Sequence, residues 1–501
     1  MNTIEIYDTT LRDGAQTEGI SFSVNDKLRI TEKLDEIGIH FIEGGWPGAN
    51  PKDNTFFSKV KKIKLTNSRI VAFGSTRRAG EQADKDAVLA GLLKSGAGVI
   101  TLFGKSWDLH VREVLKTDLD ENLRMIEDSV RFLRSKGKYV IYDAEHFFDG
   151  YKANREYALR TLLAAEAGGA ERIVLCDTNG GALTSQVFEI IEDVREKVKA
   201  PIGIHTHNDC EMAVANSIAA VQAGAVHVQG TINGYGERCG NANLISVIGN
   251  LKLKMGMDCV SDIALKELTE VSRFVADISN MRQEDNQPFV GASAFAHKAG
   301  VHINAILKSS LSYEHIDPQK VGNKRRLIIS ELSGKSSIIT KGKEIDLDFD
   351  SEKSQDRKIL RTLQKLEEEG YQFESAEASL ELFMKRAMGK FRDFFQLKDF
   401  RVIVEKRERR KVTSEATIKI KVGDKIEHTA SLGDGPVNAL DNALRKALRD
   451  FYPGLATMHL ADFKVRVLDE KGGTAAKVRV LIQSQDTEDS WWTIGVSENI
   501  I

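Results

Sequence analysis

The amino-acid sequence predicts a (β/α)8 barrel, in which eight parallel strands alternate with helices. One observation is the regular alternation of short apolar segments and amphipathic helical stretches over about the first 250 residues. The other is that polar side chains follow the ends of several strands, where the active sites of such barrels lie. An open, doubly wound sheet is the main alternative, and the number of strands argues against it.

The expected strands and helices follow one another in a regular order. Apolar segments predicted to be strands lie at residues 4–9, 41–45, 70–75, 99–103, 139–145, 172–178, 202–207 and 227–232. Amphipathic stretches predicted to be helices include 24–37, 119–134 and 154–167. Ser23 and Asp26 have the spacing of a capping box at the start of the first helix, and Gly38 suits its end.

Composition changes after the barrel. Residues 276–370 are expected to form short helices and loops, and their charged stretch 346–369 resembles a solvated helical connector. Alternating apolar residues at 416–422 and 463–467 then predict half-buried strands. Three parts are therefore expected, namely a catalytic barrel at 1–275, a linker at 276–370 and a small α+β domain at 371–501.

One helix is expected within the small α+β domain. Pro436 suits the first turn of a helix, because its missing N–H has no partner to lose there. The apolar stripe of this helix is expected to consist of Val437, Leu440, Leu444, Leu448 and Phe451.

Charge and composition exclude several classes of function. A formal net charge of -2 on 501 residues gives no electrostatic basis for binding nucleic acid or an acidic membrane. The sequence shows no signal peptide and no long uncharged apolar run, so a soluble, cytoplasmic protein is expected. Its cysteines match neither a zinc-site nor a disulfide pattern, and reduced, mostly packed thiols are expected at Cys176, Cys210, Cys239 and Cys259.

Two histidines on the seventh strand are candidate metal ligands. His205 and His207 are two positions apart, and a strand sends such residues to the same side. An isolated pair of this kind is more often satisfied by neighbouring residues. Asp13 follows the first strand, and Asn241 lies beyond the eighth strand and beside the first, so both add oxygen ligands at the same rim. Two imidazoles and a carboxylate leave coordination positions free for substrate, as in a catalytic metal site.

Three further rim residues have two interpretations each. Arg12 is expected either to pair with a rim carboxylate or to hold a substrate carboxylate and stabilise an enolate. Thr178 is expected either to cap the following helix or to hydrogen-bond a substrate carboxylate. Glu145 is the carboxylate we expect to act as a general base next to a carbonyl group, with an ion pair to Arg12 as its structural alternative.

The glycine-rich segment 234–240 could be taken for a dinucleotide-binding loop. Its last spacing is one residue too long for G-x-G-x-x-G, and no ribose-binding acid follows in a new βαβ unit. We interpret it as a barrel loop that positions Asn241.

Several motifs resemble one family of metal-dependent barrels. Segments 8–16, 205–209 and 236–243 resemble the signatures of the metallolyase-type barrels that include α-isopropylmalate synthase, homocitrate synthase and citramalate synthase. The resemblance continues through 297–302 and 433–437 and covers essentially the whole chain. Within the family, segments 44–53, 73–78 and 142–150 look most similar to bacterial citramalate synthases of the longer type.

The resemblance implies an activity and roles for individual residues. It implies condensation of acetyl-CoA with pyruvate to (R)-citramalate and CoA in isoleucine synthesis, with a divalent metal (Mg, Mn or Zn). The implied metal ligands are Asp13, His205, His207 and Asn241. Arg12 and Thr178 would contact the keto acid, and Glu145 would act in enolisation. His302 and Tyr313 match positions that complete the site in relatives, often from the other subunit of a homodimer.

The resemblance leaves some questions open. Many relatives have aspartate after the strand-five glutamate, whereas this chain has His146, so the local partners of Glu145 do not carry over. The alternatives are an α-isopropylmalate synthase that uses 2-ketoisovalerate, a related acyl-CoA lyase, and a non-catalytic amino-acid sensor. The C-terminal domain resembles the feedback domain of the synthases, and isoleucine is the expected inhibitor.

Overall fold

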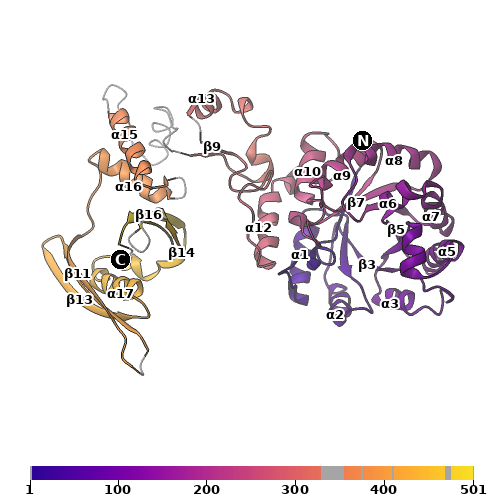
Figure 1. Ribbon diagram of the computed structural model, residues 1–501, viewed down its shortest axis with the longest axis horizontal. Helices are drawn as coiled ribbons and strands as arrows, with labels where there is room; N and C mark the ends of the chain where they lie inside the picture. Colours follow the sequence, from indigo (N-terminus) through magenta and orange to yellow (C-terminus); the bar gives the residue numbers. More distant parts are fainter. Residues whose placement is uncertain are drawn as a thin grey trace. The chain divides into compact units, whose positions relative to one another are not determined.

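The computed structural model describes residues 3–298, 300–328, 355–373, 376–408, 411–468 and 476–499 (Figure 1). The chain forms two compact units. The first consists of Met1–Phe295 together with His315–Arg325, and the second of Ala296–Glu314 together with Arg326–Ile501. The chain therefore leaves the first unit once, returns to it briefly, and then continues in the second.

The first unit contains the expected closed barrel, so the predicted fold class is confirmed. Its strands are all parallel to their neighbours, and β8 pairs with β1 to close the barrel. The strands are β1 (Glu5–Asp8), β2 (Phe41–Gly45), β3 (Arg69–Ser75), β4 (Val99–Lys105), β5 (Tyr139–Glu145), β6 (Arg172–Asp177), β7 (Ile202–Thr206) and β8 (His227–Gly230). Each predicted segment agrees with these bounds to within two residues at either end.

Helices surround the barrel (Figure 1). They are α1 (Val24–Glu36), α2 (Pro51–Val60), α3 (Ala87–Ser95), α4 (Asp108–His110), α5 (Leu119–Ser135), α6 (Phe147–Ala153), α7 (Arg155–Gly168), α8 (Thr184–Lys197), α9 (Ala213–Gln222), α10 (Leu244–Leu253), α11 (Asp262–Leu265) and α12 (Leu268–Ile278). The predicted capping box of α1 is present, because Ser23 and Asp26 each accept the backbone N–H of the other. Among the described helices, none is both long and apolar enough to cross a membrane.

Polar side chains join the first and last strands at the amino end of the barrel. His227 on β8 is fully buried, and its Nδ1 lies 3.1 Å from Oε2 of Glu5 on β1. Arg172 donates two hydrogen bonds to the same carboxylate, at 2.9 and 2.8 Å. Gly203 on β7 makes room for the imidazole, because a Cβ there would lie 2.9 Å from its Cδ2. Burial alone would raise the pKa of Glu5, but the hydrogen bonds from His227 and Arg172 outweigh burial and lower it to about 2.

We expect Glu5→Gln to destabilise the protein at neutral pH by about 2 kcal/mol, because the charged carboxylate is favoured in the folded state. A depressed pKa contributes stability above the ordinary carboxyl pKa of 4.5, and this contribution is lost as the pH falls toward 2. Denaturant unfolding should therefore show a smaller difference between parent and variant at about pH 4 than at pH 7. The exposed Glu18→Gln is the control. A Glu5→Gln difference independent of pH would contradict this account.

The second unit contains two antiparallel sheets of three strands each. One consists of β11 (Gln396–Glu405), β12 (Thr413–Val422) and β13 (Lys425–Gly433), and the other of β14 (His459–Val467), β15 (Val478–Gln485) and β16 (Ser490–Ser497). Its other elements are β9 (Ala296–His297), α13 (Gly300–Lys308), β10 (Arg326–Leu327), α15 (Gln355–Glu368), α16 (Glu377–Ala387) and α17 (Pro436–Leu448).

The buried face of α17 agrees with the predicted stripe only in part, because Leu448 is buried and Leu440 and Leu444 pack against the same cluster, but Val437 and Phe451 do not belong to it. Ala439, Ala443, Ala447 and Leu448 are buried and pack with Ala416, Ile418 and Ile420 of β12. Val437 is 42% exposed, and Phe451 lies beyond the end of the helix. The prediction gave weight to bulky residues, whereas small alanines let the helix lie close to the sheet. On β14 the face predicted to be buried is open, because Phe463, Val465 and Val467 are 38–51% exposed in the single chain.

The charged connector and the cysteines also differ from expectation. Residues 346–354 of the connector lie outside the described residues, and the remainder forms α15. This helix buries Ile359 and Leu363 in an apolar cluster with residues of α16, so it is amphipathic and packed rather than fully solvated. All the cysteines are free thiols, but only Cys176 and Cys259 are buried. The expectation of packed thiols is therefore wrong for Cys210 and Cys239, which are exposed.

Candidate functional site

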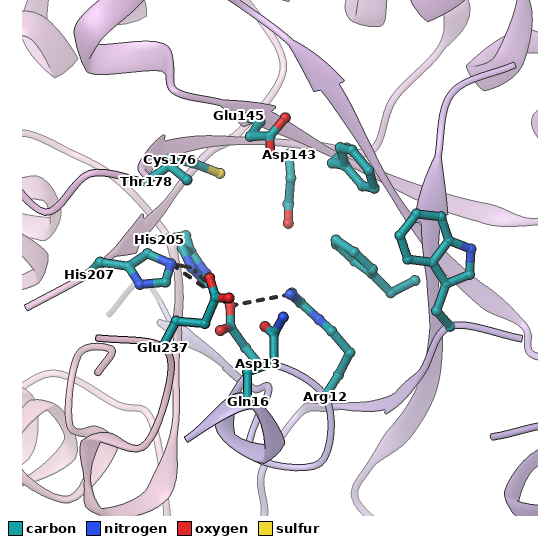
Figure 2. A pocket seen from close by; sticks show the side chains of 13 residues that line it. Arg12, Asp13, Gln16, Asp143, Glu145, Cys176, Thr178, His205, His207 and Glu237 are labelled. Carbon is teal, nitrogen blue, oxygen red and sulfur yellow. Dashed lines mark hydrogen bonds and ion pairs between the residues drawn. The ribbon is translucent and has the colours of Figure 1, made fainter. Parts of the chain in front are cut away.

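A cavity of about 250 Å³ opens at the carboxyl ends of the barrel strands, on the predicted rim (Figure 2). Residues from several strand ends and the loops that follow them line it. They are Arg12, Asp13, Gln16, Trp46, Phe73, Phe103, Asp143, Glu145, Cys176, Thr178, His205, His207 and Glu237. Most of the residues singled out from the sequence are among them, and Asn241 is buried next to His207.

Asp13, His205 and His207 meet on one side of this cavity (Figure 2). After β1 the chain turns back, because the amide of Gly14 donates to the carbonyl of Thr9 at 3.0 Å, and Asp13 is thereby brought to the histidines. Oδ2 of Asp13 lies 3.6 Å from Nε2 of His205 and 3.9 Å from Nε2 of His207. All three ligand atoms lie within 4.8 Å of one another.

Both imidazoles are electrically neutral near pH 7. Burial lowers the pKa of His207 to about 4, and the neighbouring His205 adds to this shift. Burial also lowers the pKa of His205, although the charge of Asp13 opposes the shift. Neutral imidazoles keep a ring nitrogen lone pair, which is the form that binds metal ions.

Asn241 is held beside His207 by the glycine-rich loop. An antiparallel bridge joins Asn241 to His207, so the amide lies next to the end of β7. The side chain of Asn241 also interacts with Asp13, which follows β1, as expected from the sequence. The interpretation of the loop is confirmed at Gly236, which has a φ of 155° and whose Cβ would lie 2.2 Å from the Asn241 amide nitrogen. That nitrogen donates to the carbonyl of Tyr235 at 3.1 Å.

The residues present fit a divalent metal ion. Oδ1 of Asp13 and Oδ1 of Asn241 are buried and have no hydrogen-bond partner among the described residues. Unpartnered buried acceptors are costly, and a cation would satisfy both. Two neutral imidazole nitrogens and two oxygens form a donor set that suits zinc, manganese or magnesium.

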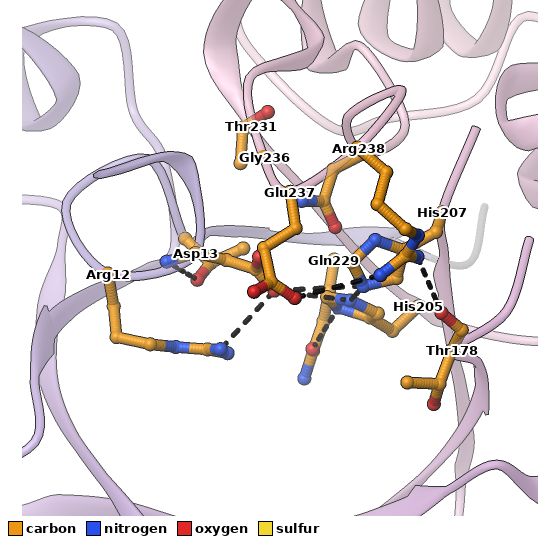
Figure 3. Close-up of polar contacts among 12 residues, drawn as sticks. Arg12, Asp13, Thr178, His205, His207, Gln229, Thr231, Gly236, Glu237 and Arg238 are labelled. Carbon is orange, nitrogen blue, oxygen red and sulfur yellow. Dashed lines mark hydrogen bonds and ion pairs between the residues drawn. The ribbon is translucent and has the colours of Figure 1, made fainter. Parts of the chain in front are cut away.

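Gln229 supports His205 from the barrel interior, and the sequence did not reveal it. Its Oε1 lies 3.0 Å from Nδ1 of His205 (Figure 3). Its amide donates to Oδ1 of Asp143 at 3.0 Å. A proton on Nδ1 leaves Nε2 of His205 free to bind a metal, so Gln229 fixes the required tautomer. Burial, with the charge of Glu43 adding, raises the pKa of Asp143 to about 8. Gln229 lies two residues after His227 on β8, so both side chains face the barrel interior. This spacing is the sequence feature from which Gln229 could have been predicted.

Arg12 is fixed by three contacts. Its guanidinium pairs with Glu43, lies 3.3 Å from Oδ2 of Asp13, and stacks over Phe73 with Cζ 3.8 Å from the ring centroid. Burial opposes its charge, but Glu43 and Asp13 outweigh burial and raise the pKa of Arg12 above its ordinary value. The expected ion pair with a rim carboxylate is therefore present, and Glu43 is that partner.

Three aromatic side chains form one wall of the cavity. Trp46 lies edge-on to Phe73 and Phe103, with ring centroids 5.9 and 5.5 Å away, and the two phenyl rings stack at 5.2 Å. Trp46 follows β2, and Phe73 and Phe103 lie near the carboxyl ends of β3 and β4. They were not predicted to be site residues, because apolar residues at such positions look like ordinary core.

Two expected partnerships at the rim are different in the structure. Glu145 pairs with Lys105 and not with Arg12, because Lys105 ends the neighbouring strand whereas Arg12 is taken by Glu43. Thr178 does not cap α8, whose first turn begins at Thr184. Its hydroxyl oxygen instead accepts the backbone N–H of His146 at 2.8 Å, so its own proton is free for another acceptor.

His302 and Tyr313 belong to the second unit and do not line the cavity. Their rings stack with centroids 4.2 Å apart. Tyr313 is 47% exposed. Both side chains are available at the surface of the single chain.

Comparison with known proteins places this site in a family. The HMGL-like family model matches residues 3–275, the "homocitrate synthase post-HMGL domain-like" model matches 289–370, and the "LeuA allosteric (dimerisation) domain" model matches 374–501. The (R)-citramalate synthase of Geobacter sulfurreducens is 57% identical, covering 100% of this chain and 95% of that protein. The chain belongs to the (R)-citramalate synthases of the HMGL-like family.

Other relatives of the chain are also condensing synthases. The (R)-citramalate synthase of Aquifex aeolicus is 55% identical over 99% of this chain and 95% of that protein. The 2-isopropylmalate synthase of Methanocaldococcus jannaschii is 30% identical over 99% of this chain and 92% of that protein. The chain is therefore an acyltransferase of the acetyl-CoA condensing class, and the lyase and sensor alternatives are not supported.

We expect His207→Ala to abolish tight metal binding and Gln229→Leu to weaken it by roughly 10–100-fold, because loss of a supporting hydrogen bond frees the tautomer and ring orientation of His205. Titration of metal-free protein with Mn²⁺ or Zn²⁺ in a calorimeter would measure both effects. Gln222→Leu, on the exposed end of α9, is the matched control and should bind as the parent does. If His207→Ala bound the metal as tightly as the parent, the assignment of His205 and His207 as metal ligands would be wrong.

Proposed function

We propose that this synthase condenses acetyl-CoA with pyruvate and hydrolyses the thioester, releasing (R)-citramalate and CoA for isoleucine biosynthesis. The observation that carries the proposal is identity of 47–57%, over 99–100% of this chain, to five proteins named (R)-citramalate synthase. The rim supports it with a metal-ligand set, a fixed guanidinium and a carboxylate in one cavity.

The keto acid is proposed to bind between the metal ligands and Arg12. A divalent ion held by Asp13, His205, His207 and Asn241 would supply the Lewis acidity that polarises the keto group. Arg12 is already oriented by Glu43 and Phe73, so it presents positive charge to the substrate with little loss of side-chain freedom. Thr178 donates its hydroxyl proton to the substrate carboxylate, since its oxygen already accepts from His146.

Glu145 is proposed to start the reaction as the general base. It takes a proton from the acetyl methyl group, and the resulting enolate carbon attacks C2 of pyruvate. The π bond of the keto group opens, and the C2 oxygen takes up a proton to become the hydroxyl of citramalyl-CoA. Water then cleaves the thioester of citramalyl-CoA, which makes synthesis effectively irreversible. His302 and Tyr313 are proposed to complete the site from the neighbouring subunit, where their stacked rings offer an imidazole and a phenol.

The aromatic wall supports pyruvate as the keto acid. Trp46, Phe73 and Phe103 pack against one another, and the guanidinium of Arg12 stacks on Phe73. These side chains therefore have little room to move away from a larger substrate. A rigid apolar wall accepts the methyl group of pyruvate and opposes the branched side chain of 2-ketoisovalerate.

Purified protein should release CoA from acetyl-CoA faster with pyruvate than with 2-ketoisovalerate or 2-ketoglutarate, by at least about tenfold in kcat/KM, because the branched side chain of the first and the added carboxymethyl group of the second meet the aromatic wall. Thiol release, followed with and without Mn²⁺ or Mg²⁺, measures this directly. The release should require the metal. No thiol release with any of the three keto acids would refute the synthase proposal, and a preference for 2-ketoisovalerate would replace it with an isopropylmalate synthase.

The C-terminal part is proposed to regulate the enzyme. In this division of the chain the barrel at 1–275 carries the chemistry, 276–370 completes the site, and 371–501 binds the effector and joins two copies into a homodimer. The match of residues 374–501 to an allosteric dimerisation domain supports this role. Isoleucine is proposed as the inhibitor because it is the end product of the proposed pathway, and the enzyme is proposed to act in the cytoplasm.

Isoleucine should lower the rate of CoA release, and leucine and valine at equal concentration should inhibit less. The reason is that feedback inhibition requires an effector site selective for the end product of the proposed pathway. Hydrogen exchange of the full-length protein, measured with and without isoleucine, should slow within residues 371–501, because the bound ligand stabilises the fold around it. Inhibition accompanied by protection confined to 1–275 would place the effector at the active site and contradict this proposal.

A further inference from the structure

Lys105 is paired with the proposed general base, and no role has been assigned to it. β4 ends at Lys105 and β5 ends at Glu145, and the two residues are partners in the parallel register of these strands. Their side chains therefore leave the barrel wall side by side at the rim. The ammonium group of Lys105 forms an ion pair with Oε2 of Glu145.

Two arginines at this rim are each held by several groups. Arg12 contacts Glu43, Asp13 and Phe73. Arg238 donates to Asp209 at 2.8 and 3.0 Å and to the carbonyl of Thr178 at 2.9 Å. Within the part of the chain that the structure describes, the ammonium of Lys105 hydrogen-bonds to Glu145 alone. A lysine with a single hydrogen-bond partner on a flexible stem can transfer that hydrogen bond to another anion.

The main chain at Lys105 is fixed while its ammonium lies near the cavity. The amide of Asn122 donates to the carbonyl of Lys105 at 2.9 Å, and the N–H of Ser106 donates to the carbonyl of Glu145 at 3.2 Å. Nζ of Lys105 lies 5.6 Å from the ring centroid of Phe103, which lines the cavity. The Lys105 and Glu145 side chains are only 15% and 24% exposed, so their charges are weakly screened by water.

We propose that Lys105 is a catalytic residue that binds the thioester oxygen of acetyl-CoA and stabilises the enolate. This inference rests on the proposed function. During enolisation a methyl C–H bond breaks, the proton passes to Glu145, the electron pair forms a C=C bond, and negative charge moves to the thioester oxygen. Glu145 becomes neutral at the moment the oxygen becomes negative. Lys105 thereby exchanges one anionic partner for another, and no uncompensated charge appears.

The inference separates the roles of the two rim cations. Arg12 is next to the metal ligand Asp13 and its contacts fix it on the side of the keto acid. Lys105 is next to Glu145, where the acetyl group must lie if Glu145 is to reach its methyl proton. One cation therefore serves the electrophile and the other serves the nucleophile.

The test is Lys105→Ala in the full-length, metal-loaded enzyme. We expect kcat for CoA release to fall by about 100-fold or more with KM for pyruvate little changed, because a donor to a developing oxyanion is lost. The primary isotope effect with trideuterated acetyl-CoA should rise, since proton removal becomes slower. Propylammonium added to the buffer should restore activity in part, and Lys105→Arg should retain more activity than Lys105→Ala.

The control is Lys152→Ala, an exposed lysine of α6 on the same rim, which should behave as the parent does. Metal content and thermal unfolding of every variant establish that the site is folded. Parent-like activity of Lys105→Ala overturns the inference. So does a loss that neither raises the isotope effect nor responds to propylammonium or arginine, because Lys105 would then only hold Glu145 in place. A parent enzyme that releases no CoA with pyruvate refutes the proposed function instead.

Discussion

The alternation of side chains along the barrel strands is the constraint on which the site depends. Residues two apart on a strand face the same side, and in a closed barrel one side is the interior. On β8 this places both His227 and Gln229 inside, at successive levels. His227, at the lower level, hydrogen-bonds with Glu5, and Gln229, at the upper level, hydrogen-bonds with His205 and Asp143.

This interior is unusually polar, and its levels connect the barrel floor to the rim. Tyr7 on β1 is the register partner of Gln229, and its buried hydroxyl contacts Glu43 and Thr101. Glu43 in turn holds Arg12 at the cavity. Buried polar groups are costly unless they are hydrogen-bonded, so each level restricts the positions of the next. The guanidinium and the imidazoles at the rim are therefore oriented before any substrate arrives.

Periodicity and strand count were enough to predict the barrel and the rim, because both are repeated along the chain. The meeting of Asp13 with His205 and His207 followed from strand order alone. The partners of these residues did not follow. Gln229 and Lys105 are ordinary polar residues in the sequence, and their roles arise from contacts across neighbouring strands. The alanine face of α17 was missed because small side chains carry a weak hydrophobic signal although they allow close packing.

The pairing of β1 with β8 also has a consequence for biosynthesis of the protein on the ribosome. Glu5 is the register partner of His227, so the first strand has no partner on one edge until more than 220 residues have been made. Contacts between residues so distant in sequence form slowly, and an unpaired strand edge is prone to associate with other chains. Asp13 cannot meet His205 and His207 before this closure. A nascent chain therefore cannot assemble this candidate metal-ligand group until the barrel has closed.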